Sequence, residues 1–321
     1  MESTATGPRT PRPNNPRKSR LIMVPLDGSS FAETALPTAL TVAKAWDAEI
    51  EVVTVHEPLP NLDHSTWDSV SRQWAEAYLA ELVIRVEKSQ GASLASARLD
   101  GPVADSLQHH AEERQVELVV MASHGRGPMT RAWLGSVADA FVRHATTPVL
   151  VVRPDEGRVG DLTEPVCFDH VLIPLDGSEE SRVVLEPALD LGTACSCRFT
   201  LLRVYPYGED FAAAYLPHTV QLNAHTLAEG REKALAEIEA QADELTARGF
   251  EAKGRIVVDR SPAAGILRAA EELDVDLVAM ATHGRAGITR MLLGSVTDKV
   301  LRGAHVPLLV CRPQGNPEGR S

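Results

Sequence analysis

The chain contains two copies of one sequence pattern, and this repeat limits the possible folds more than any other feature. RLIMVPLDGSS at residues 20–30 matches HVLIPLDGSEE at 170–180, and ASHGRGPMTRAWLGS at 122–136 matches ATHGRAGITRMLLGS at 281–295. Self-similarity over this length indicates two folding units of the same kind. With 321 residues, of which 44% are hydrophobic, the chain is long enough for two packed cores. We predict one domain over residues 20–154 and a second over 167–313.

The segments outside the two copies are polar and show no periodicity. Residues 1–19 combine Arg and Lys with four prolines, a composition that cannot bury apolar surface, so we predict a disordered basic tail. Residues 155–166 are polar, contain Gly and Pro, and are predicted to form a linker. Residues 314–321 are predicted to be a second disordered tail.

Short apolar runs alternate with longer stretches of helical period in both copies. The predicted strands are 21–24, 52–55, 94–99, 118–121 and 149–152 in the first copy, and 171–173, 201–204, 255–258, 277–280 and 308–311 in the second. Amphipathic stretches such as 75–87 and 227–245 are predicted to be packing helices. Repeated βαβ units form parallel sheets covered by helices on both faces. The expected fold class is α/β, with two tandem doubly wound five-stranded parallel-sheet sandwiches that are Rossmann-like.

A glycine-rich turn lies between a predicted strand and a predicted helix in each copy. The glycines are Gly125 and Gly135 in the first copy and Gly284 and Gly294 in the second, with nine residues between the members of each pair. Glycine allows a ligand to approach the main chain closely. Ser136 and Ser295 follow, with Asp139 and Asp298 three residues later, which predicts a capping-box-like helix start. A helix N-terminus attracts phosphate, although a serine-capped helix after a glycine turn also occurs without any ligand.

Two further residue types around these turns suit a phosphorylated ligand. Asp27 and Asp176 end the first strand of each copy, at the strand ends where open parallel sheets bind ligands. Either carboxylate can accept hydrogen bonds from ribose hydroxyls, or can form an Asx turn with the following G-S. Arg126 and Arg285 flank the first glycine of each turn, where a guanidinium either contacts phosphate or faces solvent.

Charge, hydropathy and motif content exclude several classes of protein. The net charge of -12 argues against a surface built to bind nucleic acid or anionic lipid. No apolar run is long enough to span a bilayer and no secretory signal is recognised, so we expect a soluble cytoplasmic protein. The four cysteines show no zinc-site spacing, and the cluster from His109 to Glu113 is interpreted as the solvent side of a helix, so no metal ligands are predicted. Neither a P-loop nor a G-x-G-x-x-G motif is present, and no catalytic residues are assigned.

The repeated motifs resemble those of the universal stress protein family in its tandem, two-domain form. The resemblance rests on V-P-L-D-G-S and I-P-L-D-G-S at the first strands, and on S/T-H-G, nine residues and G-S before P-V-L-V-V-R-P or P-L-L-V-C-R-P at the last strands. It covers about residues 18–154 and 166–313. ATP-binding members begin the turn with G-x-x-G. In this chain Ala122 and Ala281 replace the first of these two glycines, and Gly125 and Gly284 are the second.

The resemblance implies an ATP site in each domain, with or without Mg²⁺, and a regulatory role in the stress response. The implied nucleotide-binding residues are Pro25, Asp27, Val55, Ala122, Gly125, Arg126, Gly135, Ser136 and Val137 in the first domain, and Pro174, Asp176, Val204, Ala281, Gly284, Arg285, Gly294, Ser295 and Val296 in the second. It also implies that the two domains pair through their last strands, 149–152 and 308–311, with a homodimer as a further option. Slow ATP hydrolysis or adenylyl transfer, and a dimerisation scaffold that binds no nucleotide, stay open as alternatives.

Overall fold

The computed structural model describes residues 19–57, 64–123, 134–153, 162, 166–193, 195–205, 224–282 and 293–313. In residues 64–68 and 224–227 it describes the backbone alone. Almost all of the predicted tails and linker therefore lie outside the described residues. The same holds for Gly125, Arg126, Gly284 and Arg285 of the two glycine-rich turns.

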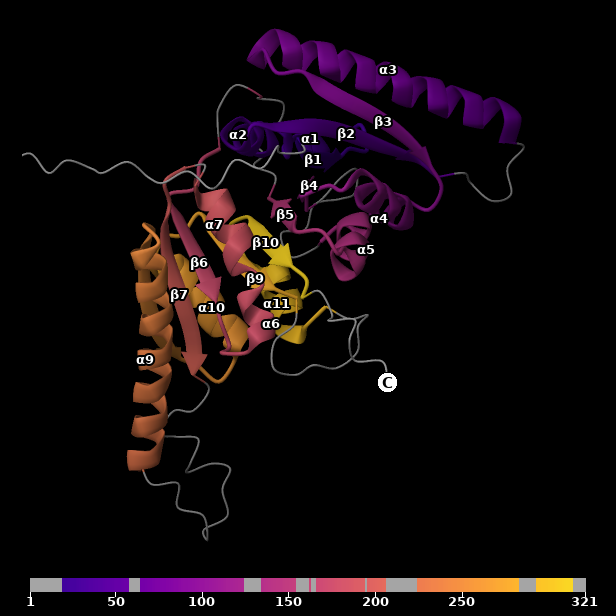
Figure 1. Ribbon diagram of the computed structural model, residues 1–321. Coiled ribbons are helices and arrows are strands. Elements are labelled where there is room, and N and C mark those ends of the chain that lie inside the picture. The colour runs from indigo at the N-terminus through magenta and orange to yellow at the C-terminus, as the bar shows by residue number, and fades with distance from the viewer. Residues whose placement is uncertain are drawn as a thin grey trace, which may run out of the picture.

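In the part of the chain that the structure describes, ten strands form one continuous sheet (Figure 1). They are β1 (Arg20–Pro25), β2 (Ala48–His56), β3 (Leu94–Asp100), β4 (Leu118–Ala122), β5 (Val149–Val152), β6 (His170–Pro174), β7 (Arg198–Tyr205), β8 (Glu251–Val258), β9 (Leu277–Ala281) and β10 (Leu308–Cys311). All ten predicted strands are confirmed, and β2, β7 and β8 begin three or four residues earlier than predicted. β4, β5, β6, β9 and β10 are buried along their whole length, as expected for apolar strands covered on both faces.

The strand order explains where each half can bind a ligand. Within the sheet the order is β3-β2-β1-β4-β5-β10-β9-β6-β7-β8. All neighbouring strands within a half are parallel, and the order reverses between β1 and β4 and again between β6 and β9. Ligands of open α/β sheets bind outside the carboxyl ends of the strands at such reversals. The parallel strands and the two reversals of strand order confirm the predicted α/β, doubly wound fold class.

The two halves meet at an antiparallel pair of strands. Leu309 of β10 lies opposite Leu150 of β5, flanked by Leu308 opposite Val151 and Val310 opposite Val149. This confirms the predicted pairing of the last strands within one chain. The pairing also removes one exposed edge from each half-sheet.

Helices cover both faces of the sheet. They are α1 (Ser30–Glu33), α2 (Leu36–Trp46), α3 (His64–Gln90), α4 (Val103–Arg114), α5 (Ser136–His144), α6 (Glu179–Arg182), α7 (Leu185–Thr193), α9 (Ala224–Ala247), α10 (Pro262–Glu272) and α11 (Ser295–Gly303). Side chains of α2, α3, α7 and α9 pack into one core that runs through both halves, and those of α4, α5, α10 and α11 pack into the core on the other face. The predicted packing helices 75–87 and 227–245 lie within α3 and α9.

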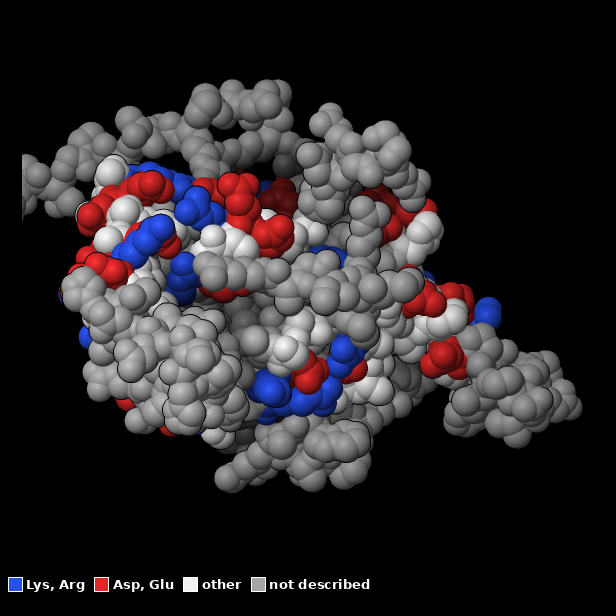
Figure 2. All heavy atoms as spheres, turned by 90° about the horizontal axis from the view of Figure 1, so that it is seen from below, with Lys and Arg blue, Asp and Glu red and all other residues white. Residues whose placement is uncertain are grey.

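Acidic and basic side chains lie close together on the face shown in Figure 2. Among the described residues, many opposite charges form ion pairs, such as Arg248 with Glu186 at 2.8 Å. In the same part of the chain, no helix has the length and apolar character needed to cross a membrane.

Candidate functional site

A cavity of about 380 Å³ lies at the carboxyl ends of β1, β2 and β4, where the strand order of the first half reverses. Seven predicted site residues line it, namely Pro25, Asp27, Val55, Ala122, Gly135, Ser136 and Val137. They come from segments more than one hundred residues apart in the sequence, and the parallel strands bring them together. The other two residues predicted for this site lie in the undescribed part of the glycine-rich turn.

The rest of the cavity wall is mostly apolar and was not predicted as part of a site. It includes Val53, Val103, Leu107 and Met121. Val53 could have been found from the sequence, because alternate residues of a strand share a face and Val55 was already implicated. Leu107 and Val103 belong to α4, and no local pattern distinguishes them from ordinary core positions. A cavity with apolar walls and a few polar groups is typical of small-molecule sites.

Asp27 shapes the turn that follows β1. Its Oδ1 accepts hydrogen bonds from the backbone N–H of Ser29 at 2.9 Å and from the Ser29 hydroxyl at 2.6 Å. The Ser29 hydroxyl oxygen in turn accepts from the N–H of Ala32 and caps α1. Gly28 between them has φ +80°, a conformation that favours glycine. The Asx-turn interpretation of Asp27 is therefore present in the structure, at a residue that also lines the cavity.

The start of α5 is fixed against the end of β4. The N–H of Gly135 donates to the carbonyl of Ser123 at 2.7 Å, and the N–H of Ser123 donates to Val152 on β5 at 2.8 Å. These bonds place Gly135 and Ser136 on the cavity wall although the residues between 123 and 134 are not described. The first N–H groups of a helix have no acceptor within the helix and carry its positive dipole end.

The predicted capping box at Ser136 and Ser295 is wrong. Gly135 and Gly294 are the N-cap residues of α5 and α11, and neither helix start has a side-chain capping bond. The physical reason is that the N-cap position is taken by a glycine, which has no side chain, so the serine and the carboxylate lie one residue beyond the capping-box positions. The carboxylates of Asp139 and Asp298 instead form charge-assisted bonds to arginine guanidinium groups.

The second half repeats the main elements of this arrangement. Pro174 ends β6, Val204 lies on β7 and Ala281 ends β9. Gly294 is the N-cap of α11, which begins with Ser295 and Val296. Oδ1 of Asp176 accepts from the N–H and the hydroxyl of Ser178 at 2.9 and 2.5 Å, as Asp27 does with Ser29. The N–H of Gly294 donates to Thr282 at 2.8 Å, as Gly135 does to Ser123.

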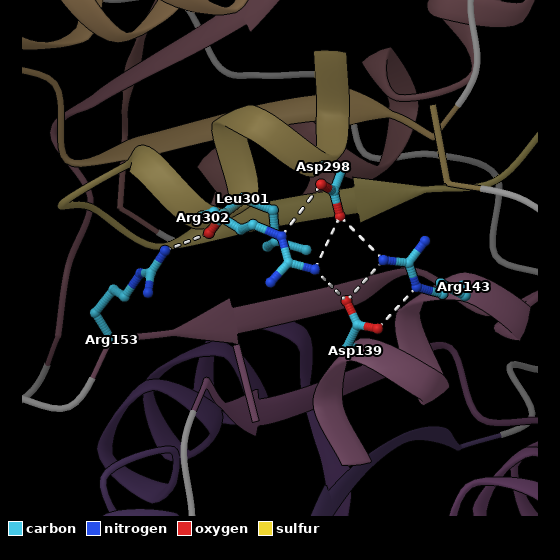
Figure 3. A network of polar contacts seen from close by, with 6 residues as sticks. All are labelled: Asp139, Arg143, Arg153, Asp298, Leu301 and Arg302. Atoms are coloured by element: carbon cyan, nitrogen blue, oxygen red, sulfur yellow. Dashed lines mark hydrogen bonds and ion pairs between the residues drawn. The ribbon is translucent and has the colours of Figure 1, made fainter. Parts of the chain in front are cut away.

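Four charged side chains join α5 to α11 across the boundary between the halves (Figure 3), and we call Asp139, Arg143, Asp298 and Arg302 the interdomain quartet. Each arginine binds both aspartates. Arg143 lies 2.8 Å from Asp139 and 3.0 Å from Asp298, and Arg302 lies 3.1 Å from Asp298 and 3.0 Å from Asp139. The hydrogen bond from Arg143, with the charges of Arg143 and Arg302, lowers the pKa of Asp139, so the carboxylate is charged at neutral pH.

Two more arginines cross the boundary. Arg312, just after β10, donates to the carbonyl of Arg143 at the end of α5 at 3.1 Å. Arg153, after β5, donates to the carbonyl of Leu301 in α11 (Figure 3), and burial lowers the pKa of this guanidinium. Cations at helix C-termini interact favourably with the helix dipole. Sequence analysis assigned no role to Arg143, Arg153, Arg302 or Arg312. The i, i+4 spacing of Asp139 and Arg143, which recurs in Asp298 and Arg302, was the available signal.

The histidine cluster on α4 differs in part from its predicted role. His109 is exposed on the solvent side, as expected. His110, however, packs against β2, where its Nε2 lies 2.8 Å from the buried carboxylate of Glu51. No group of three or more His, Cys, Asp or Glu side chains capable of holding a metal occurs among the described residues.

The cysteines of the C-x-C sequence occupy different environments. Cys197 is buried, its thiol donates to the carbonyl of Phe168 at 2.6 Å, and burial raises its pKa to about 12. Cys195 is half-buried and lies beside the exposed Cys167, and burial raises the pKa of Cys195 to about 11. Thiols with raised pKa values are poor nucleophiles at neutral pH.

Comparisons with known proteins agree on one family. The profile of the Universal stress protein family matches residues 18–153 and 168–312. A universal stress protein of Mycobacterium tuberculosis (strain ATCC 25618 / H37Rv) is 29% identical over 319 residues, covering 93% of this chain and 99% of that protein. The crystal structure of a universal stress protein from Archaeoglobus fulgidus DSM 4304 superposes with a TM-score of 0.68 at 22% identity, over 92% of this chain and 99% of the other. A solved universal stress protein in complex with cAMP is 23% identical, covers 43% of this chain and 98% of its own, and has a TM-score of 0.34.

Proposed function

This chain belongs to the universal stress protein family, and from that premise we propose that it is a regulatory protein of the stress response that binds ATP in the cavity of its first half and at the equivalent position in its second half. The observation that carries the proposal is the cavity at the carboxyl ends of β1, β2 and β4, bounded by the start of α5. We also propose residues 20–154 and 167–313 as the two domains.

The cavity wall has the two chemical characters that an adenine nucleotide requires. Val53, Val55 and Met121 offer an apolar surface for a flat base. Gly135 and Ser136 lie at the uncapped positive end of α5, which favours a phosphate group. Gly135 also has no side chain, so a phosphate can approach the backbone closely there. Asp27 lies on the same wall and would accept hydrogen bonds from the ribose hydroxyls.

The proposal extends to the undescribed residues of each turn. Gly125 and Arg126, with Gly284 and Arg285, would contact the phosphates. Any bound Mg²⁺ would then be held mainly by those phosphates, because Mg²⁺ is commonly held by one or two carboxylates together with substrate phosphates. Nucleotide occupancy would regulate the protein without rapid turnover.

The direct test is to identify and titrate the ligand. Small molecules released by denaturing the freshly purified protein are identified by mass spectrometry, and ATP, AMP and cAMP are titrated by calorimetry with and without Mg²⁺. We expect two ATP molecules per chain. Gly135→Leu, which fills the first cavity, is expected to reduce the number of sites to one, and the matched Gly294→Leu is expected to do the same for the second half.

Both glycines have φ −58°, a backbone conformation that leucine adopts without strain, so the variants should fold. ATP turnover measured on the same samples separates binding from slow hydrolysis or adenylyl transfer. Wild-type protein that carries no nucleotide and binds none at millimolar concentrations would contradict the proposal and favour the scaffold alternative.

A further inference from the structure

The interdomain quartet is charge-balanced, and its balance depends on both halves of the chain. Two carboxylates share two guanidinium groups, and each guanidinium bonds to both carboxylates, as Figure 3 shows. All four side chains are partly buried, with exposed fractions from 24% to 36%, so solvent screens them less than it screens free surface charges. Removal of one arginine therefore leaves one negative charge that both aspartates share.

The quartet lies one helical turn from both candidate phosphate positions. The N–H of Asp139 donates to the carbonyl of Gly135 at 2.8 Å, and Gly135 lines the first cavity. The N–H of Asp298 donates to the carbonyl of Gly294 at 2.9 Å in the second half. A carboxylate in the first turn stabilises a helix but opposes an anionic ligand bound at the same end. The bound arginines cancel that opposition.

We propose that Arg302 of the second half is an electrostatic determinant of anion affinity at the first cavity, and that Arg143 has the same role for the second half. This inference rests on the proposed binding of ATP. It concerns the net charge of the quartet and does not require a contact between either arginine and the ligand. Each binding site is then electrostatically complete only when the other half is in place.

The test uses the full-length chain with Gly294→Leu, which restricts ATP binding to the first cavity. In this background, Arg302→Gln leaves the quartet with a net charge of -1 and is expected to weaken ATP binding about three- to tenfold. This is the Coulomb effect of one unit charge on one phosphate charge at roughly 10 Å in an effective dielectric of about 25 to 50. Asp298→Asn gives a net charge of +1 and is expected to bind ATP at least as tightly as the background. Affinities are measured by calorimetry at low salt.

The deciding variant is the double substitution Asp298→Asn/Arg302→Gln. It lacks the same Arg302 contacts as the single variant but restores a net charge of zero, so its ATP affinity is expected to return to within about twofold of the background. The difference between single and double variants should shrink as salt rises, because screening shortens the range of the charge. Arg248→Gln removes the same charge from an ion pair with Glu186 on the opposite face of the sheet, and is expected to leave affinity unchanged.

Three results overturn the inference. A double variant that binds as weakly as Arg302→Gln would assign the loss to packing, and an unchanged affinity in Arg302→Gln would show that the charge does not reach the site. Wild-type protein that binds no ATP would remove the proposed function and this inference with it. Either of the first two results, obtained while the wild type still binds ATP, would remove this inference alone.

Discussion

Among single residues, Asp27 combines a structural role with a place on the cavity wall. Its Oδ1 holds the Ser29 N–H and hydroxyl, and Ser29 caps α1. The same pattern at Asp176 and Ser178 in the second half shows that the turn is a property of the repeated D-G-S sequence. Asparagine can form this turn through its amide oxygen, whereas alanine cannot. The two substitutions therefore separate the turn from the carboxylate.

We predict that Asp27→Ala lowers the free energy of unfolding by about 1 to 2 kcal/mol, because two donors of the turn lose their acceptor. Asp27→Asn should retain the turn, with a loss below about 0.5 kcal/mol. Both variants should bind ATP less tightly in the Gly294→Leu background, since neither provides a second carboxylate oxygen. Urea unfolding and calorimetry measure the two effects. Wild-type affinity in Asp27→Asn would restrict this residue to a structural role.

Among the elements, α3 is attached to α1 through a buried carboxylate. The Glu33 side chain is 8% exposed and accepts hydrogen bonds from the hydroxyl of Tyr78 at 3.0 Å and from Arg85. Burial, followed by the charge of Glu33, raises the pKa of Tyr78 above its ordinary value of 10.0. A buried carboxylate is tolerated only with such partners. Since α1 directly follows the Asp27 turn, this contact also supports one side of the cavity.

We predict that Tyr78→Phe lowers the free energy of unfolding by about 1 to 2 kcal/mol at pH 8, because Glu33 loses one buried donor. The folded state keeps the Tyr78 proton above pH 10, where the unfolded chain releases it. The wild type should therefore lose more stability than Tyr78→Phe between pH 10 and pH 11. Urea unfolding at each pH measures the difference. A matched Glu33→Gln/Tyr78→Phe cycle should show non-additivity, and strictly additive losses would contradict a direct interaction.

At the scale of the whole molecule, the ten-stranded sheet and the contacts on both of its faces join the two halves. Leu150 and Leu309 face each other across the strand pair and are 0% and 1% exposed. On the face opposite the quartet, the indole N–H of Trp46 in α2 donates to the carbonyl of Asp190 in α7 at 2.9 Å. Both cores and the sheet run through the two halves, so unfolding one half would expose apolar surface of the other, and the halves are expected to unfold together.

We predict a single cooperative unfolding transition for the whole chain. Two probes that lie in different halves of the sequence test it. All four tryptophans lie in the first half and all four cysteines in the second, so fluorescence reports on one half and thiol labelling on the other. The buried Cys311, whose pKa is raised to about 12, should label only on unfolding. Leu309→Ala should cost about 2 to 5 kcal/mol and should lower both midpoints equally.

The matched variant Leu150→Ala, on the first-half side of the pair, should also shift both midpoints. Separate midpoints for tryptophan fluorescence and Cys311 labelling in the wild type would show that the halves unfold independently.

The sequence by itself determined the features that depend on local patterns and on their repetition. Apolar runs identified all ten strands, and the βαβ order identified the parallel sheet. In the first half, the D-G-S motif after β1 and the G-S motif at the start of α5 both contribute residues to the cavity wall. Each of these signals is contained in a few neighbouring residues or recurs at a fixed offset. The position of the cavity could therefore be predicted, whereas the α4 residues in its wall could not.

Only the tertiary structure decided which partners the charged side chains have. Local spacing assigned Asp139 and Asp298 to helix caps and His110 to solvent, but Asp139 binds Arg302, which is 163 residues away, and His110 binds Glu51. A carboxylate takes the most favourable donors within reach, and those donors come from elements that only folding brings near. The placement of one half against the other therefore created the interdomain quartet, and neither repeat alone contains it.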